Sequence, residues 1–179
     1  NLTDEAFILA SKHQSLYDTV VTYLFLPKHV TVMKRELLRA PVFGQYAYKV
    51  GVIAIDRAGA AKTLKALTKS TLHWISKGFG VLIYPEGTRR APGAEPRYQV
   101  GVFALYKAAE SVCVPMATNS GVFWPRAGRE PRPGTLVYDV CPALPPGLDR
   151  ADFMARLEGA IEPASDALLA AAREEGAYP

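Results

Sequence analysis

The hydrophobic positions of the chain alternate between short apolar runs and longer segments with helical spacing. The short runs are rich in β-branched residues and predict strands over Phe7–Ala10, Val30–Met33, Val52–Ile55, Gly80–Tyr84, Cys113–Ala117 and Thr135–Cys141. The spacing between them predicts helices over Ser15–Leu26, Glu36–Val50, Gly59–Lys77 and Val100–Ser111. Strands that are apolar throughout are typical of sheets buried on both faces. The pattern therefore predicts an α/β fold, with a mainly parallel central sheet covered by helices on both faces.

The last third of the sequence has a different pattern. Prolines are frequent between positions 123 and 146 and predict surface loops around one short strand. A helix with an apolar stripe follows, and Pro163 is expected to interrupt it, so that residues 164–173 form a second piece. A chain of 179 residues is expected to form one domain, residues 1–179.

Charge is distributed unevenly along the chain, whose formal net charge is +4. Residues 1–90 hold 13 Lys and Arg against 6 Asp and Glu, whereas residues 91–179 hold 8 against 11. A basic half favours anionic partners such as phosphates, nucleic acid or an acidic membrane surface. The basic residues are not interleaved with aromatic ones, so nucleic acid is not expected as a partner. The histidines and the two cysteines lack metal-ligand spacing, and no metal site is expected.

The residues that follow the predicted strands carry the candidate chemistry. Ligands of open parallel sheets gather at the carboxyl ends of the strands, which form one edge, here called the strand-end edge. The segments expected there are Lys12-His13, Lys34-Arg35-Glu36, Asp56-Arg57, Glu86-Gly87-Thr88-Arg89-Arg90 and Thr118-Asn119-Ser120. Their composition predicts an anion site beside a proton-transfer group.

His13 and Asp18 have the spacing H-x-x-x-x-D. A carboxylate in the first turn of a helix can hold one nitrogen of the imidazole, so that the other nitrogen can accept a proton from a hydroxyl group. The same residues allow a second interpretation, because Ser15 followed by Asp18 also has the spacing of a helix capping box. The spacing alone leaves both interpretations open.

The basic segments also allow two interpretations each. Gly87, Thr88 and Arg89 can bind a phosphate through the backbone and a guanidinium group, but the same residues are common in ordinary turns. Arg57 beside Asp56 can form a surface ion pair, and the charges around Lys34 can form a solvated face. No complete phosphate-binding P-loop, dinucleotide fingerprint or G-x-S-x-G motif is present in the sequence.

Four blocks in a fixed order carry a family resemblance. They are H-Q-S-L-Y-D at 13–18, K-R-E-L at 34–37 with G-V-I-A-I-D-R at 51–57, P-E-G-T-R at 85–89, and V-P-M at 114–116. Together they resemble the lysophospholipid acyltransferase family, in particular its bacterial 1-acyl-sn-glycerol-3-phosphate acyltransferases. Two positions depart from the family pattern: Lys12 stands where Asn is frequent, and Arg90 stands where Ser or Thr is frequent. Both are expected to make the strand-end edge more basic.

The resemblance implies roles for particular residues. His13 is implied as the general base and Asp18 as its orienting partner, in the transfer of a fatty acyl group from acyl-CoA or acyl carrier protein without a bound cofactor. An oxyanion donor is implied at Lys34 or at backbone N–H groups near it, and Pro115 lies in the block associated with the acyl donor. The residues implied to bind the acceptor phosphate are Arg57, Glu86, Gly87, Thr88 and Arg89.

The implied acceptor is a lysophospholipid, most simply 1-acyl-glycerol-3-phosphate, and the product is then phosphatidic acid for phospholipid biosynthesis. Two alternatives remain open: another lysolipid acceptor such as lyso-ornithine lipid, or a catalytically silent phospholipid-binding module. The resemblance also implies an upstream membrane-associated segment outside this sequence. The domain is expected to associate with the anionic cytoplasmic face of the inner membrane through basic and aromatic residues.

Overall fold

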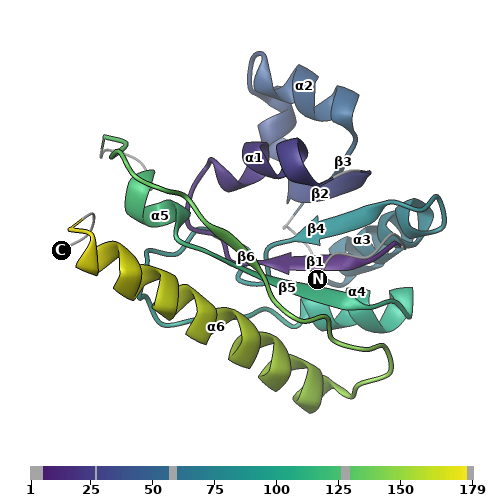
Figure 1. Ribbon diagram of the computed structural model, residues 1–179. Helices are drawn as coiled ribbons and strands as arrows, with labels where there is room; N and C mark the ends of the chain where they lie inside the picture. Colours follow the sequence, from purple (N-terminus) through teal and green to yellow (C-terminus); the bar gives the residue numbers. More distant parts are fainter. Residues whose placement is uncertain (1–5, 27, 57–59, 126–129, 177–179) are drawn as a thin grey trace.

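The central element of the protein is a mostly parallel β-sheet (Figure 1). The computed structural model describes residues 6–26, 28–56, 60–125 and 130–176. Over these residues the sheet has six strands in the order β3-β2-β4-β1-β5-β6. The strands are β1 (Ile8–Ser11), β2 (His29–Lys34), β3 (Val52–Ile55), β4 (Gly80–Ile83), β5 (Cys113–Thr118) and β6 (Tyr138–Val140). The first five are parallel and β6 is antiparallel to β5, so the predicted α/β class is confirmed.

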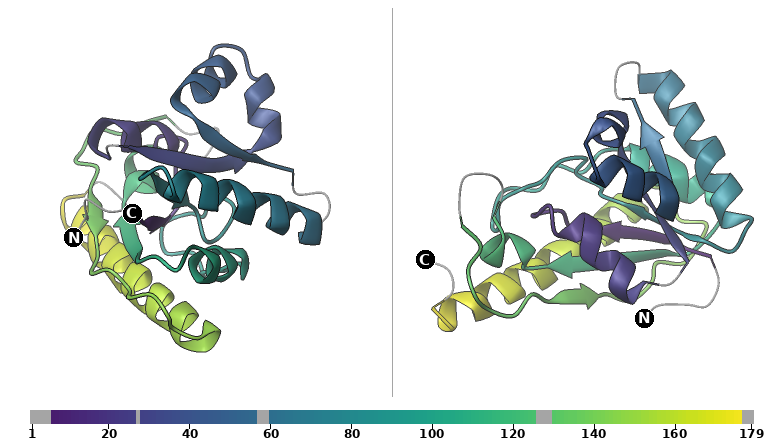
Figure 2. Two further views of the ribbon diagram at one scale, coloured as in Figure 1. Left: turned by 90° about the vertical axis from the view of Figure 1, so that its right-hand side faces the viewer. Right: turned by 90° about the horizontal axis from the view of Figure 1, so that it is seen from above.

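Helices cover both faces of this sheet (Figure 2). They are α1 (Asp18–Phe25), the 3₁₀ helix η1 (Arg35–Arg39), α2 (Phe43–Val50), α3 (Ala60–Ile75), α4 (Gly101–Ala109), α5 (Ser120–Phe123) and α6 (Arg150–Glu174). Because side chains of a strand alternate between its faces, Ile8 and Ala10 of β1 pack into the cluster formed with α3, α4 and α6. Phe7 and Leu9 pack on the opposite face, in a smaller cluster that includes Leu26 at the end of α1.

Two expectations about helices were wrong. The segment predicted as one helix over Glu36–Val50 is divided into η1 and α2 around Pro41, which lacks a backbone N–H. Conversely, α6 continues through Pro163 rather than stopping there. Its buried stripe of Phe153, Leu157, Ile161, Ser165, Leu169 and Ala172 spans both halves of the helix. Burial of this stripe outweighs the cost of a proline inside a helix, about 3 kcal/mol.

The strand order sets which of the predicted segments meet. β1 lies between β4 and β5, so residues after β1 are flanked by those that follow β4 and β5. β2 is one strand further away, and β3 is at the edge of the sheet. None of the helices in the described ranges is long and apolar enough to cross a membrane.

Candidate active site

The side chains of His13 and Asp18 are hydrogen-bonded to each other. The His13 Nδ1 atom lies 2.9 Å from Asp18 Oδ2, and the same oxygen accepts hydrogen bonds of 2.8 Å from the backbone N–H groups of Gln14 and Ser15. The sequence allowed either a helix cap or an imidazole partner for this carboxylate. The structure combines the two, because a single oxygen closes the turn before α1 and also holds the imidazole.

The second oxygen of Asp18 is held from a different part of the chain. The hydroxyl group of Tyr138 on β6 donates a 2.8 Å hydrogen bond to Asp18 Oδ1. Burial on its own would raise the pKa of Asp18, but the hydrogen bond and charge of His13 and the backbone N–H of Ser15 outweigh it, so the pKa is lowered. Burial and the Asp18 charge raise the pKa of Tyr138, which therefore keeps its proton and remains a donor. Asp18 is thus an ionised carboxylate with both oxygens in hydrogen bonds.

The imidazole of His13 is fixed on a second side by an aromatic ring. It stacks on Tyr84 with ring centroids 3.9 Å apart and an interplanar angle of 19°. The side chain of His13 is 13% exposed, whereas that of Asp18 is fully buried. Because an ionised carboxylate only accepts hydrogen bonds, Nδ1 carries the proton and Nε2 has a free lone pair. This tautomer has the form that a general base requires.

The turn after β4, residues 85–90, lies directly beside His13. The backbone N–H of Arg90 donates a 2.8 Å hydrogen bond to the carbonyl oxygen of His13. Gly87, with φ of +65°, closes the turn through a 2.9 Å hydrogen bond to the carbonyl of Tyr84, a conformation that favours glycine. Thr88 is exposed and Arg89 is partly exposed. The turn that carries Gly87, Thr88 and Arg89 is therefore hydrogen-bonded to the backbone of His13, and its binding of an anion stays a prediction.

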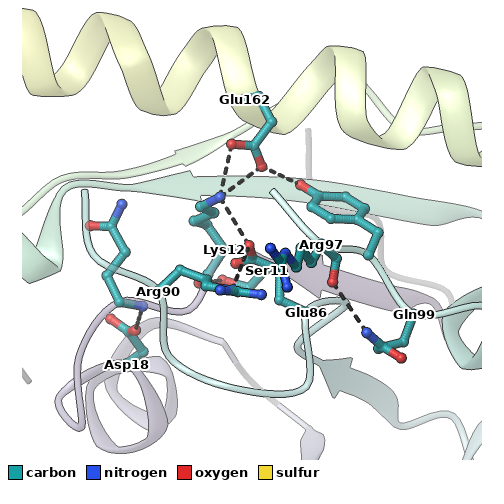
Figure 3. A network of polar contacts seen from close by, with 10 residues as sticks. Ser11, Lys12, Asp18, Glu86, Arg90, Arg97, Gln99 and Glu162 are labelled. Atoms are coloured by element: carbon teal, nitrogen blue, oxygen red, sulfur yellow. Dashed lines mark hydrogen bonds and ion pairs between the residues drawn. The ribbon is translucent and has the colours of Figure 1, made fainter. Parts of the chain in front are cut away.

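The expectation that Lys12 makes the strand-end edge more basic was wrong. The side chain of Lys12 is only 3% exposed, and its Nζ lies 2.8 Å from both carboxylate oxygens of Glu162 on α6. A second carboxylate, that of Glu86, is 3.4 Å from the same Nζ and 3.9 Å from Nε of Arg90 (Figure 3). Lys12 therefore adds no free positive charge at this edge, because two acidic groups surround it.

Comparison with known proteins identifies the family of this chain. The family model described as Acyltransferase matches residues 1–119, which include the His13–Asp18 pair and the 85–90 turn. The chain belongs to the acyltransferase family. It is 38% identical over 144 residues to a 1-acyl-sn-glycerol-3-phosphate acyltransferase of Pseudomonas aeruginosa, an alignment that covers 80% of this chain and 56% of that protein.

Other relatives of this acyltransferase domain have similar names. It is 30% identical over 154 residues to the human 1-acyl-sn-glycerol-3-phosphate acyltransferase beta, covering 84% of this chain and 55% of that protein. The chain thus spans about half the length of the curated relatives it matches. The fold matches the crystal structure of the 1-acyl-sn-glycerophosphate (LPA) acyltransferase PlsC from Thermotoga maritima with a TM-score of 0.78 and 19% identity, over 94% of this chain and 68% of that one.

Among the residues that the structure describes, two of the expected site residues of the acyltransferase domain lie away from His13. Lys34 is the exposed last residue of β2, which β4 separates from β1. Pro115 is buried inside β5 opposite Ala10, rather than at the strand-end edge. Arg57 lies outside the described residues, and its role remains a prediction.

Three neighbours of the site were not predicted from the sequence: Tyr84, Tyr138 and Glu162. Tyr84 precedes the 85–90 block directly, so its contact with His13 could have been found by pairing β1 with β4. Tyr138 falls inside the predicted strand Thr135–Cys141, but its approach to Asp18 depends on the antiparallel register of β6. Glu162 lies on α6 beyond the 119 residues that the family model matches, and no local pattern marks it.

Proposed function

We propose that this domain transfers a fatty acyl group from an acyl thioester to the free hydroxyl of 1-acyl-glycerol-3-phosphate, giving phosphatidic acid for phospholipid biosynthesis. The observation that supports the proposal best is the His13–Asp18 pair, with Nε2 of His13 free and donors for an anion on the adjacent 85–90 turn. The names of relatives that share 38% and 30% identity support the same acceptor.

The proposed reaction needs one base and no covalent enzyme intermediate. Nε2 of His13 accepts the proton of the acceptor hydroxyl while the hydroxyl oxygen attacks the carbonyl carbon of the thioester. The resulting tetrahedral oxyanion collapses, the C–S bond breaks, and the imidazolium returns the proton to the leaving thiolate. Asp18 holds the imidazole in place and stabilises its charged form. The donor is acyl-CoA or acyl carrier protein, and no resident cofactor takes part.

The acceptor phosphate is proposed to bind at the strand-end edge. Arg89 and Thr88 are accessible there, and Gly87 allows the phosphate to approach the backbone. Arg57 is proposed as a second cation. Glu86 is proposed to act differently from its neighbours, because its carboxylate faces the ammonium group of Lys12 and would repel a phosphate. Lys34 remains a proposed oxyanion donor and Pro115 a proposed residue of the acyl-donor side.

A thiol-release assay tests this function. The protein is mixed with palmitoyl-CoA or palmitoyl-acyl carrier protein and with 1-acyl-glycerol-3-phosphate, lyso-ornithine lipid or lysophosphatidylcholine, and free thiol and product lipid are measured. We expect transfer to the phosphate-bearing glycerol lipid, and a loss of about 10³-fold or more for His13→Ala. His73→Ala, at an exposed position of α3, is the matched control.

Three outcomes would contradict parts of the proposal. Near-normal transfer by His13→Ala would exclude the general-base mechanism. A preference for lyso-ornithine lipid that Arg89→Ala does not change would exclude the phosphate acceptor. Binding of lysolipid without thiol release from either donor would indicate a silent lipid-binding module.

Because acceptor and product are lipids, the domain is also proposed to bind the anionic cytoplasmic face of the inner membrane. One side of α1 and of the turn before it has exposed apolar side chains at intervals of four residues: Leu16, Val20 and Leu24. Leu24 is 81% exposed. Tyr23 of α1 contacts Tyr46 of α2, which brings a second helix with exposed apolar side chains to the same side. Exposed apolar side chains beside basic ones are typical of surfaces that bind the membrane interface.

Co-sedimentation with vesicles tests the membrane proposal. With vesicles of phosphatidylglycerol and phosphatidylethanolamine at low salt, we expect binding, and Leu24→Asp should lower the partition coefficient roughly tenfold. Leu72→Asp, at an exposed position of α3, is the matched control. Equal binding of the two variants would exclude the α1 surface, and no binding by the wild type would exclude the membrane proposal for this domain.

A further inference from the structure

A buried ionic cluster joins three distant parts of the chain behind His13. Lys12 follows β1, Glu86 lies in the turn after β4, and Glu162 lies on α6 (Figure 3). Tyr98 donates a 2.7 Å hydrogen bond to Glu162 Oε1, so this carboxylate is held by two donors. Lys12, Glu86 and Tyr98 fall in the segment that the family model matches, whereas Glu162 lies beyond it.

The direction of the Lys12 side chain follows from the alternation of the extended chain. His13 faces Asp18 on the α1 side of the sheet, and the preceding residue Lys12 faces α6 on the opposite side. An ammonium group that is 3% exposed requires a charged partner, because an unpaired charge is costly to bury. Glu162 provides that partner from α6, which packs against β5.

The cluster also controls the charge of Glu86. Burial raises the pKa of Glu86, the charge of Lys12 lowers it, and the nearby charge of Glu162 raises it again. Arg90 and Lys12 are the cations that face Glu86 in the structure. If Lys12 were neutral, Glu86 and Glu162 would face each other as two carboxylates with only Arg90 to compensate them.

We infer that Glu162 and Lys12 are positioning residues of the active site, through which the C-terminal helix α6 holds the two turns that carry His13 and Arg89 in register. This inference rests on the proposed function. Lys12 is adjacent to His13, and Glu86 is in the 85–90 turn, so the Lys12–Glu86 contact holds the same pair of turns that the Arg90 N–H to His13 carbonyl hydrogen bond joins. Glu162 acts on the chemistry only by holding Lys12 between them.

The positioning role predicts that the double variant of Lys12 and Glu162 is more active than the Lys12 variant alone. Glu162→Gln leaves Lys12 with one full partner and should lower kcat about tenfold with little change in KM, since a small displacement of a reacting group has large effects on rate. Lys12→Met should lower kcat about 100-fold, because it leaves two buried carboxylates facing each other. Adding Glu162→Gln to Lys12→Met removes one of these charges, so the double variant should be several-fold more active than Lys12→Met alone.

The test combines steady-state kinetics with hydrogen–deuterium exchange of the wild type, Glu162→Gln, Lys12→Met and the double variant. Glu158→Gln is the control, with the same chemical change at an exposed position one turn earlier on α6. In Glu162→Gln the amides of Gln14, Ser15 and Arg90 should exchange faster, since these three donate the hydrogen bonds that define the two turns. Exchange at β5 amides should stay unchanged.

The results separate this inference from the function on which it rests. A wild type with no thiol release would exclude the proposed function, and faster exchange confined to the two turns would still support the positioning role. An active wild type with Glu162→Gln equal to Glu158→Gln in kcat and in exchange would overturn the inference. A double variant no better than Lys12→Met would also overturn it, because the two carboxylates would then not be coupled through Lys12.

Discussion

His13 and Lys12 are neighbours in sequence, but their side chains meet opposite environments at the end of β1. On the α1 side, His13 is held by a carboxylate and an aromatic ring, and none of the described residues forms an ion pair with its second nitrogen. On the α6 side, Lys12 is surrounded by the carboxylates of Glu86 and Glu162. The two sides therefore differ in their proposed roles: the imidazole on one side is the proposed base, and the paired charges on the other side are inferred to hold the backbone.

The difference lies in what each carboxylate does. Asp18 accepts only from neutral donors and from an imidazole, so its charge remains available to stabilise an imidazolium. Glu86 and Glu162 share a permanent cation, so their charges are already compensated. A substitution on the His13 side should lower the rate while the fold stays stable, whereas one on the Lys12 side should lower the stability as well as the rate.

After the loss of His13 itself, the largest expected effect on the rate comes from Asp18→Asn. The asparagine oxygen at the place of Oδ2 would keep the hydrogen bonds from His13 Nδ1 and from the backbone N–H groups of Gln14 and Ser15, and the amide group would replace Oδ1 opposite the Tyr138 hydroxyl. The substitution removes the negative charge that stabilises the imidazolium form of His13, so kcat should fall about 10³-fold while the fold is retained. Steady-state thiol release and circular dichroism check this prediction.

Asp166→Asn, at an exposed position of α6, serves as the control for that substitution. If Asp18→Asn kept a kcat within a few-fold of the wild type, the carboxylate would serve only as a helix cap and the contrast between the two sides would disappear.

The Lys12 side should respond most strongly in stability. Lys12→Met leaves the buried carboxylate of Glu86 and the partly buried carboxylate of Glu162 without their common partner, and removal of one member of a buried ion pair costs about 3–5 kcal/mol. The free energy of unfolding, measured by urea titration, should fall by about this amount. Lys107→Met, at an exposed position of α4, should leave it nearly unchanged. A loss below 1 kcal/mol for Lys12→Met would mean that the cluster contributes little to the fold.

A smaller effect on the rate is expected from Tyr138→Phe, which removes only the hydroxyl group bonded to Asp18 Oδ1. A hydrogen bond to a charged group contributes about 1.5–3 kcal/mol. Only a part of this energy stabilises the transition state relative to the bound substrate, so kcat should fall about tenfold with KM unchanged. Tyr23→Phe is the matched control, because it removes a 3.1 Å hydrogen bond between the hydroxyls of Tyr23 and Thr31 on the same side of the sheet. Equal losses in the two variants would indicate a general packing effect.

Much of this arrangement could be predicted from the sequence, because parallel strands impose their own geometry. Apolar runs located all six strands of the described sheet, and the rule that ligands gather at strand carboxyl ends brought His13 and the 85–90 turn to one edge. The spacing of His13 and Asp18 allowed both a helix cap and a paired imidazole, and the structure contains both because the two residues lie within one strand–helix turn. These contacts depend on neighbours in sequence or on adjacent parallel strands.

The remaining contacts depend on tertiary packing that no local pattern encodes. The hydrogen bond from Tyr138 requires the register of an antiparallel edge strand, and the contact of Lys12 with Glu162 requires the position of α6 across the sheet. The burial of Lys12 could not be predicted either, because a lysine after a strand is normally solvated. Pro163 was misjudged for the related reason that the buried stripe of α6 overrides the local cost of proline.

The finest distinction between the two sides is expected in acid. The pKa of Asp18 is lowered from its ordinary 3.8, so its contribution to stability is complete above that pH and is lost as the pH falls through the lower folded value. The pKa of Glu86 is raised from 4.5, so its ionisation opposes folding above its folded pKa, and this cost disappears below 4.5. On acidification, wild type should therefore lose its stability advantage over Asp18→Asn, but gain stability relative to Glu86→Gln. Urea titrations between pH 7 and pH 3 measure both differences in the free energy of unfolding. If both differences changed with pH in the same direction, the opposite pKa shifts of Asp18 and Glu86 would be contradicted.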